Sequence, residues 1–548
     1  MRWRIATFVL TVAAAVFCML LASCGNAEPQ VLKAAKQKIL LVGNSADPST
    51  LDPTLSTGLG EFKILSGLFE GLVRADEDTL RVEPAAAESW EVSEGGKVYT
   101  FRLRDGLRWS DGEPLKASDF VFAWRRALNP SIGAEYASLM YCIKNAEAIN
   151  SGREKNLSAL GARALDSRTL RIELEAPTPY FLNMLYLNIF FPLPEHVLKK
   201  FGAAESRNSF WTRAGNMVSN GAFILSAWRI NDKVSIRRNP LYWDTKSIKI
   251  NGVDFFPIGN ANTEDRAFRA GQLHITDSVP ISRMDSIRAK LSDCLRSEDW
   301  LGTYYYIFNT RRPPFDDSRV RRALSMSINR GQIIEAFLKA GQKPAFALVP
   351  PNCSNSWRAG EAPHFFENIA EARRLLSEAG YPEGKGFPKF KLVYNTSEIH
   401  KPIAEAIQQM WRENLGIEAE LYNLSWPAYL AARRAGDFDV ARSNWVGDFD
   451  APETFLGLFE SSSGLSHTGY GNPLFDAAMA KARSSADNAE RIEALKSAEN
   501  ILMRDMPLMP IYFYSRVCLV SPILKNWKSN ILDYHNYRNV DFYISEPL

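Results

Sequence analysis

In the run of residues 98–104, hydrophobic and polar residues alternate from Tyr99 to Arg104. The apolar positions of this run are Tyr99, Phe101 and Leu103. A period of two is typical of a β-strand with one buried face and one solvated face. Short runs rich in β-branched and aromatic residues, each flanked by turn residues, predict two further strands near residues 220–225 and 234–237.

In the second half of the chain the apolar residues follow a helical spacing instead of the period of two. Val320, Ala323 and Leu324 have helical spacing. Further on, the pattern predicts strand, helix, strand, helix and strand over residues 390–394, 403–411, 417–421, 427–434 and 438–441, with Gly416 ending the first helix. This alternation favours an α/β lobe. Because no repeat and no flexible linker divides the chain, domains built from non-consecutive segments fit the pattern.

The N-terminus has the features of an export signal. Arg2 and Arg4 precede an apolar run that ends in Leu-Ala-Ser-Cys at residues 21–24, which resembles the bacterial lipoprotein box. We therefore expect a lipoprotein signal peptide over 1–23, acylation of Cys24, and a tether over 24–38. No later stretch is apolar and long enough to span a bilayer. The expected location is the periplasm or cell envelope, with the lipid as the only contact to the membrane; a plain cleaved signal or an uncleaved anchor is the alternative.

Composition narrows the class of protein. The chain has 548 residues, and 65 Lys+Arg against 62 Asp+Glu give a net charge of +3. A strong basic excess, which nucleic-acid binding requires, is absent. Hydrophobic residues make up 46% of the chain, so the protein folds around a sizeable core rather than remaining disordered.

Four cysteines remain outside the signal region, and no CxxC pair occurs among them. They are Cys142, Cys294, Cys353 and Cys518. An exported protein can form disulfides, and four cysteines allow three complete pairings. A body of this size does not need them, so buried free thiols are the favoured expectation.

Motifs for catalysis are missing. The sequence has no G-x-x-x-x-G-K-[ST] loop, no G-x-S-x-G elbow and no H-E-x-x-H pair. Its six histidines never lie three to five residues apart, which excludes a local metal pair on a helix. We therefore expect no enzyme activity, no catalytic residue, no bound metal and no cofactor. Clusters of tyrosine and tryptophan beside single charges instead suit a cleft that encloses an organic ligand.

Several motifs together resemble the signature region of the extracellular solute-binding proteins, family 5. They are Ala87-Glu-Ser-Trp90, residues 99–104, Trp109-Ser-Asp-Gly112 and residues 119–124. Further matches cover nearly the whole mature chain, at residues 51–53, 68–72, 219–223, 238–243, 313–315 and 319–324. The stretches 136–138, 303–306, 394–400 and 439–445 resemble the oligopeptide-binding members of that family.

This resemblance implies a mixed α/β, two-lobed periplasmic-binding-protein fold of the large three-domain type, with non-contiguous segments. Domain I is expected over 39–70, 191–301 and 516–548, domain II over 71–190, and domain III over 302–515. The implied partners are short peptides and the permease and ATPase subunits of an ABC importer. We expect a monomer that binds no nucleic acid.

The resemblance also implies a ligand-binding set. Asp448 falls where the family places the carboxylate that pairs with the α-ammonium of a peptide, a role that suits a buried cation. Trp445 and Trp426 match aromatic residues of side-chain pockets, and Tyr136 matches a residue that contacts the peptide backbone. The set is completed near these positions by Val446, Gly447, Tyr305 and Tyr514.

The other end of a peptide is a carboxylate, which arginine and lysine can bind. The positions implied for peptides of different lengths are His400, Arg433, Arg442 and Lys339. The segment 55–60, which includes Leu59, is expected to supply extended backbone that pairs with the peptide as an added strand.

Two departures from the relatives concern side-chain preference. Gly302 and Val446 stand where a close relative carries a pair of disulfide-forming cysteines, and Thr57 replaces an acidic residue. The leading hypothesis is a peptide-capturing lipoprotein of an ABC importer. The alternatives are a receptor of the same fold for dipeptides, metal chelates or a signalling peptide, a secreted hydrolase, and a surface adhesin that no longer transports.

Overall fold

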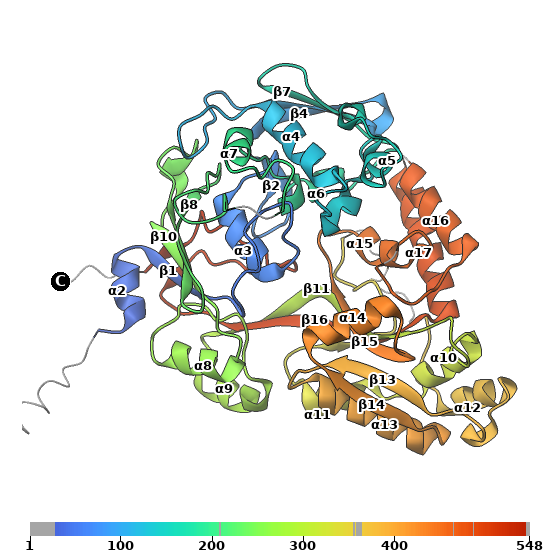
Figure 1. The fold of residues 1–548 in the computed structure, drawn as a ribbon. Helices are drawn as coiled ribbons and strands as arrows, with labels where there is room; N and C mark the ends of the chain where they lie inside the picture. The colour runs from blue at the N-terminus through green and yellow to red at the C-terminus, as the bar shows by residue number, and fades with distance from the viewer. Residues whose placement is uncertain are drawn as a thin grey trace, which may run out of the picture.

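Two lobes are joined by two long strands, as Figure 1 shows. The strands β11 (Leu295–Phe308) and β16 (Leu508–Leu519) pair antiparallel and run from one lobe into the other. We call residues 28–301 and 516–543 the first lobe and residues 302–515 the second lobe. This computed structural model describes residues 28–207, 210–354, 357, 364–463, 465–485 and 487–543.

The first lobe contains two four-stranded sheets. One sheet has the order β1-β10-β9-β8, in which β1 and β10 are parallel, and the other is the antiparallel sheet β4-β5-β7-β6. The strands are β1 (Ile39–Gly43), β4 (Ala87–Ser93), β5 (Val98–Leu103), β6 (Ala162–Ala164), β7 (Thr169–Glu173), β8 (Phe223–Arg229), β9 (Lys233–Arg238) and β10 (Gly252–Phe256). The three strands predicted near 98–104, 220–225 and 234–237 are confirmed by β5, β8 and β9.

Short hairpins and helices complete this lobe. The hairpins are β2 (Val73–Ala75) with β3 (Val82–Pro84), and β17 (Leu524–Lys525) with β18 (Asp541–Phe542). The helices are α2 (Gln30–Lys36), α3 (Leu59–Leu68), α4 (Ala117–Leu128), α5 (Ala146–Asn150), α6 (Phe181–Met184), α7 (Glu195–Lys200), α8 (Ala261–Arg269) and α9 (Met284–Lys290). None of the helices in the described part of the chain combines the length and hydrophobicity that a membrane crossing requires.

The second lobe is built on a six-stranded sheet of order β12-β16-β11-β15-β13-β14. Its remaining strands are β12 (Lys343–Pro344), β13 (Phe390–Asn395), β14 (Ala419–Leu424) and β15 (Val440–Val446). Its helices are α10 (Ser318–Met326), α11 (Arg330–Phe337), α12 (Ile369–Glu378), α13 (His400–Leu415), α14 (Trp426–Ala435), α15 (Glu453–Leu456), α16 (Pro473–Ser484) and α17 (Asn488–Asp505).

The predicted strand–helix unit of this lobe is confirmed. β13 and β14 are parallel, and α13 connects them. The apolar stripe of α13 is buried because Ile403, Ile407 and Trp411 face the core. Gly416 ends the helix at φ 69°, a left-handed conformation that glycine adopts without steric cost.

Residues 300–302 lie where the crossing strands change lobe. The pairing register of β11 with β16 shifts between Asp299 and Thr303, so the ladder is interrupted there. An interrupted ladder bends more easily than a continuous one, because fewer hydrogen bonds hold the two strands in register. The interruption lies where the two strands pass from one lobe to the other.

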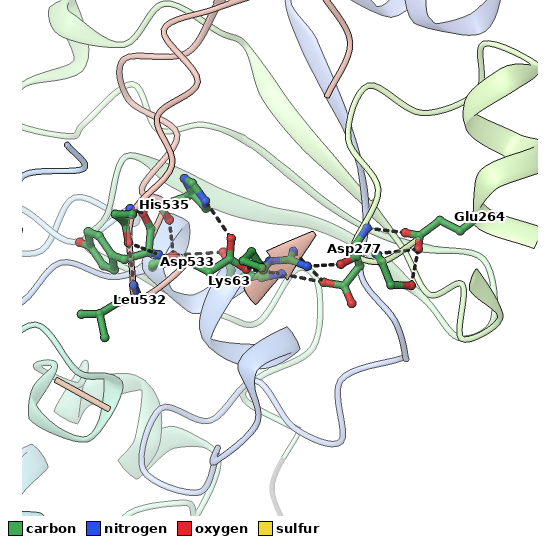
Figure 2. A network of polar contacts seen from close by, with 11 residues as sticks. Lys63, Glu264, Asp277, Leu532, Asp533 and His535 are labelled. Atoms are coloured by element: carbon green, nitrogen blue, oxygen red, sulfur yellow. Dashed lines mark hydrogen bonds and ion pairs between the residues drawn. The ribbon is translucent and has the colours of Figure 1, made fainter. Parts of the chain in front are cut away.

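A buried charge network close to this interruption holds α3, the crossing strand β16 and the C-terminal segment together (Figure 2). Lys63 Nζ lies 2.7 Å from Asp277 Oδ1 and 3.0 Å from Asp533 Oδ2. Arg516 Nε lies 2.8 Å from the same Asp533 oxygen. Burial opposes ionisation of Asp533, but Arg516 and Lys63 outweigh burial and hold its pKa well below the usual range. Two cations thus balance two carboxylates at the base of the first lobe.

The tether predicted over 24–38 is wrong for residues 30–36, which form α2. Ala34 and Ala35 are buried, and the Val31 backbone N–H donates to the Gly271 carbonyl oxygen at 2.9 Å. Val31, Ala34 and Ala35 are spaced as one face of a helix, and this apolar face docks on the lobe. Cys24 and the signal segment 1–23 lie outside the described residues.

The four remaining cysteines are free thiols, as expected, but the expected burial holds for only two of them. Two of them, Cys353 and Cys518, are buried, and the other two are half-buried. Burial raises the pKa of Cys142 to about 12 and that of Cys518 to about 11, so both stay protonated at neutral pH.

Candidate ligand-binding site

The strand β15 presents a partly open edge between the lobes. On one side β15 pairs with β11 over its whole length, from Val440 to Val446. On the other side β13 pairs only with Val440 and Ala441. Within the described part of the chain no strand continues that pairing over residues 442–446.

The direction of the free backbone groups follows from the ladder with β11. The Gly447 N–H donates to the Leu301 carbonyl oxygen at 2.7 Å. In an antiparallel ladder, alternate residues point their N–H and C=O groups to opposite edges. Asn444 and Val446 therefore direct these groups toward the open edge, where an extended chain could pair with them.

Asp448 lies just beyond this edge, at a point where three distant segments meet. Its backbone N–H donates to Thr454 Oγ1 at 3.1 Å. The hydroxyl of Tyr136, from the first lobe, donates to Asp448 Oδ1 at 3.0 Å and lies 3.4 Å from the Thr57 carbonyl oxygen. Asp448 therefore faces the space between the lobes rather than bulk solvent.

The carboxylate of Asp448 has no cationic partner among the described residues: no Lys, Arg or His nitrogen lies within 4 Å. Burial raises its pKa to about 6, although hydrogen bonds from Tyr136 and Thr454 act in the opposite direction. A partly buried carboxylate without a cation is costly, and an ammonium group supplies the missing charge. The position suits the amine end of a ligand.

Binding of an amine-bearing ligand should therefore depend on pH with a lower limb near pH 6. The raised pKa means that the free protein gains stability as pH falls through this range, whereas binding needs the ionised carboxylate and weakens. Affinity at pH 5 should be about tenfold below its plateau. Calorimetry of a short peptide across pH 5–8 checks this, and a profile flat down to pH 5 would exclude Asp448 as the titrating group.

Arg442 forms the second unbalanced charge of this region. It is 6% exposed, its Nη2 lies 3.1 Å from the Tyr514 hydroxyl, and its guanidinium carbon lies 4.7 Å from the ring centroid of Tyr304. His400 Nδ1 lies 3.2 Å from the Tyr304 hydroxyl, and burial together with the Arg442 charge lowers the pKa of His400 to about 2. No carboxylate among the described residues lies within 4 Å of Arg442. A ligand carboxylate would suit this cluster.

The predicted aromatic residues divide between two places. The half-buried Trp445 has its Nε1 3.4 Å from Thr454 Oγ1, so it packs beside Asp448. Trp426 is 52% exposed and stacks on Tyr429 with ring centroids 5.7 Å apart, and the Arg433 guanidinium lies 5.6 Å from the same Tyr429 ring. Trp426 and Arg433 thus form an aromatic and cationic surface on α14.

Other members of the predicted set have different surroundings. Tyr305 is buried in β11, on the face of the sheet opposite to Tyr304. Lys339 is exposed, and its Nζ lies 3.5 Å from the exposed carboxylate of Asp285. The structure does not bring Lys339 into contact with Asp448 or Arg442.

The extended segment predicted over 55–60 is wrong at both ends. Leu55 lies in a turn, and the 47% exposed Leu59 is the first residue of α3. Ile64, Leu65 and Leu68, in the second half of α3, are buried in the core. Only residues 56–58 remain outside the turn and the helix.

Thr454 is a site residue that sequence reasoning missed. Its hydroxyl contacts both the Asp448 N–H and the Trp445 indole, as described above. A threonine six residues after an aspartate is no recognised motif, so no pattern could have found it. Among the described residues, no group of three or more His, Cys, Asp or Glu side chains could hold a metal ion.

The fold and this interlobe site define a two-lobed binding protein, and comparison with known proteins gives its family. The sequence model of bacterial extracellular solute-binding proteins, family 5 (middle), matches residues 81–467. The periplasmic oligopeptide-binding protein OppA of Escherichia coli (strain K12) is 35% identical over 524 residues, covering 93% of this chain and 94% of that protein. The chain belongs to family 5 of the bacterial extracellular solute-binding proteins.

Two solved structures of relatives are informative about conformation. Haemophilus influenzae OppA in complex with the peptide RPPGFSPFR is 34% identical, with a TM-score of 0.81 over 92% of this chain and 99% of that one. The unliganded open form of the murein tripeptide-binding protein MppA is 35% identical, with a TM-score of 0.73 over 93% and 98%. The present lobe arrangement is more similar to the peptide complex than to that open form.

Gly302 and Val446, the two positions singled out in the sequence as departures, face each other across the β11–β15 ladder. A Cβ atom on Gly302 would lie 3.0 Å from the Tyr514 ring and 3.2 Å from Val446 Cγ2. Glycine therefore lets the Tyr514 ring pack directly on the strand, close to Arg442.

Proposed function

We propose that this protein captures short peptides between its lobes and delivers them to an ABC-type importer. The observation that carries the proposal is the Asp448 carboxylate, which is partly buried at the lobe contact and lacks a cation among the described residues. A peptide α-ammonium supplies that cation. The relatives support the assignment, because the protein of Escherichia coli is an oligopeptide-binding protein and that of Haemophilus influenzae holds a peptide.

The peptide backbone is proposed to lie along the open edge of β15. Asn444 and Val446 offer N–H and C=O groups that every peptide can bond, whatever its side chains. Arg442, with the neutral His400 nearby, is the proposed partner of a terminal carboxylate, and Arg433 is a further candidate for a different peptide length. Main-chain pairing together with recognition of the two ends gives affinity with little sequence selectivity.

Closure of the lobes is proposed to follow binding. The ligand touches both lobes only when they meet, so it shifts the equilibrium toward the closed form. The domain division 39–70, 191–301 and 516–548, then 71–190, then 302–515 belongs to this proposal. So do the lipid on Cys24, the envelope location, the monomeric state and the absence of enzyme activity.

The test is the identity of what the protein holds. Mass spectrometry of material released by denaturing the purified protein should give short peptides with free amino termini. Calorimetry with the stripped protein should then show one site per chain. A different class of bound molecule, with no binding of any short peptide, would contradict the proposal.

Incubation with the bound peptide separates a receptor from a hydrolase. The peptide should be recovered at its original mass after hours with the protein. Progressive cleavage that depends on the protein would show an enzyme instead.

A further inference from the structure

A second contact between the lobes lies beside the hydrogen bond from Tyr136 to Asp448. Phe449 directly follows Asp448, and its ring stacks on the ring of Tyr180 with centroids 5.3 Å apart and planes 4° from parallel. Phe449 belongs to the second lobe and is buried, whereas Tyr180 immediately precedes α6 of the first lobe. Two consecutive residues of one loop therefore each contact a tyrosine of the opposite lobe.

Tyr180 also faces a fixed cation of the second lobe. The guanidinium carbon of Arg491 lies 5.7 Å from the Tyr180 ring centroid. Arg491 is 1% exposed, and Glu453 holds it by two bonds of 2.7 and 2.8 Å. Glu453 precedes Thr454, whose hydroxyl accepts from the Asp448 N–H. The surface that receives Tyr180 is therefore built by neighbours of the residues that hold Asp448.

The contact lies at the edge of the hydrophobic core: Phe449 is a core residue and Tyr180 packs against the core. A cavity of about 460 Å³ adjoins it, lined by both lobes, including Tyr180, Asp450 and Arg491. Figure 1 places α6 of the first lobe beside α15 of the second. The Tyr180 ring therefore contacts the second lobe, through Phe449 and Arg491, at the edge of a cavity that the two lobes share.

We propose that Tyr180 is a positioning residue for the amine site: by stacking on Phe449 it fixes the loop that presents Asp448 and stabilises the closed arrangement of the lobes. The inference deepens the proposed function and rests on it for the identity of the ligand. Tyr180 itself contacts Phe449 and Arg491, and acts on the ligand only through Asp448.

The effect on closure and on affinity has the same origin. Offset-stacked aromatic pairs contribute enough beyond their buried area to change an equilibrium roughly 3- to 10-fold. Tyr180→Ala should lower the closed-to-open ratio and the peptide affinity by that factor. Without the stack the loop is better solvated, so the pKa of Asp448 returns toward its ordinary value and the acid limb of binding moves below pH 6.

The experiment compares four variants with the parent protein. Tyr180→Ala removes the stack, Tyr180→Phe keeps the ring, and Phe449→Leu removes the stack from the other side while keeping an apolar side chain. Tyr141→Ala is the matched control, since the Tyr141 hydroxyl bonds Asn150 within the first lobe. The closed-to-open ratio is measured without ligand by single-molecule fluorescence transfer between the lobes, and affinity with tri-alanine across pH 5–8.

Tyr180→Ala and Phe449→Leu should both lower the closed-to-open ratio and the affinity for tri-alanine, and the acid limb of their binding profile should move to lower pH. Tyr180→Phe and Tyr141→Ala should behave like the parent in both measurements. An unchanged closed-to-open ratio in Tyr180→Ala and Phe449→Leu would overturn the inference, whatever the protein binds. If the parent binds no peptide while the ratio still falls in these two variants, the lobe contact stands and the proposed function fails.

Discussion

Replacing Asp448 by asparagine is expected to weaken binding of a short peptide by about 150- to 5,000-fold. The substitution keeps the shape and an acceptor for the Tyr136 hydroxyl, but it leaves the peptide ammonium without a charged partner at the lobe contact. Removing one member of a buried ion pair costs about 3–5 kcal/mol, which corresponds to a loss of this size. Calorimetry with the same peptide on both proteins measures it.

The same variant separates binding from folding. Burial raises the pKa of Asp448 to about 6, so the ionised carboxylate is unfavourable in the free protein above that pH. Asp448→Asn should therefore unfold at the same denaturant concentration as the parent or a higher one. Asp437→Asn, an exposed carboxylate of the same lobe, should change neither quantity. Equal peptide affinity in the parent and in Asp448→Asn would show that Asp448 does not bind the peptide.

Arg126→Met is expected to lower the free energy of unfolding by about 3–5 kcal/mol. Arg126 donates to both oxygens of Asp52 at 3.1 and 2.8 Å, and the side chains are 1% and 4% exposed. Its Nε also donates to the Ala203 carbonyl oxygen at 3.0 Å. The variant leaves the buried carboxylate of Asp52 without its cationic partner. Urea denaturation of the whole protein and of the variant measures the loss of unfolding free energy.

The matched control is Arg153→Met. Arg153 Nη2 lies 2.8 Å from Glu147 Oε1, but both side chains are more than 60% exposed. Exposed ion pairs contribute about 0–1 kcal/mol, so this variant should be almost as stable as the parent. Similar losses in the two variants would mean that burial does not decide the strength of these pairs.

The regular parts of the fold could be predicted because their periods are local. The alternation at residues 98–103 became β5, with Phe101 buried and Arg102 exposed. The stripe from Ile403 to Trp411 and the stop at Gly416 gave α13 between two parallel strands. In each case the spacing of apolar residues within one segment determines whether that segment is a helix or a strand, and this spacing can be read directly from the sequence.

The site could be predicted only as far as family resemblance reached. Asp448 and Tyr136 are 312 residues apart, and no spacing rule connects them. The contacts of Thr454 with Asp448 and of Tyr180 with Phe449 depend on how a loop folds and how the lobes meet. The resemblance likewise missed that Leu59 begins the helix α3, directly after the extended Gly58.

The central claim is tested most directly by masking the charge on the ligand. One short peptide is prepared with a free amino terminus and with an acetylated one, and both are titrated into the parent protein at pH 7. The free form should bind at least about 100-fold more tightly, since only it carries the ammonium that pairs with Asp448. Equal affinity for the two forms would contradict the account.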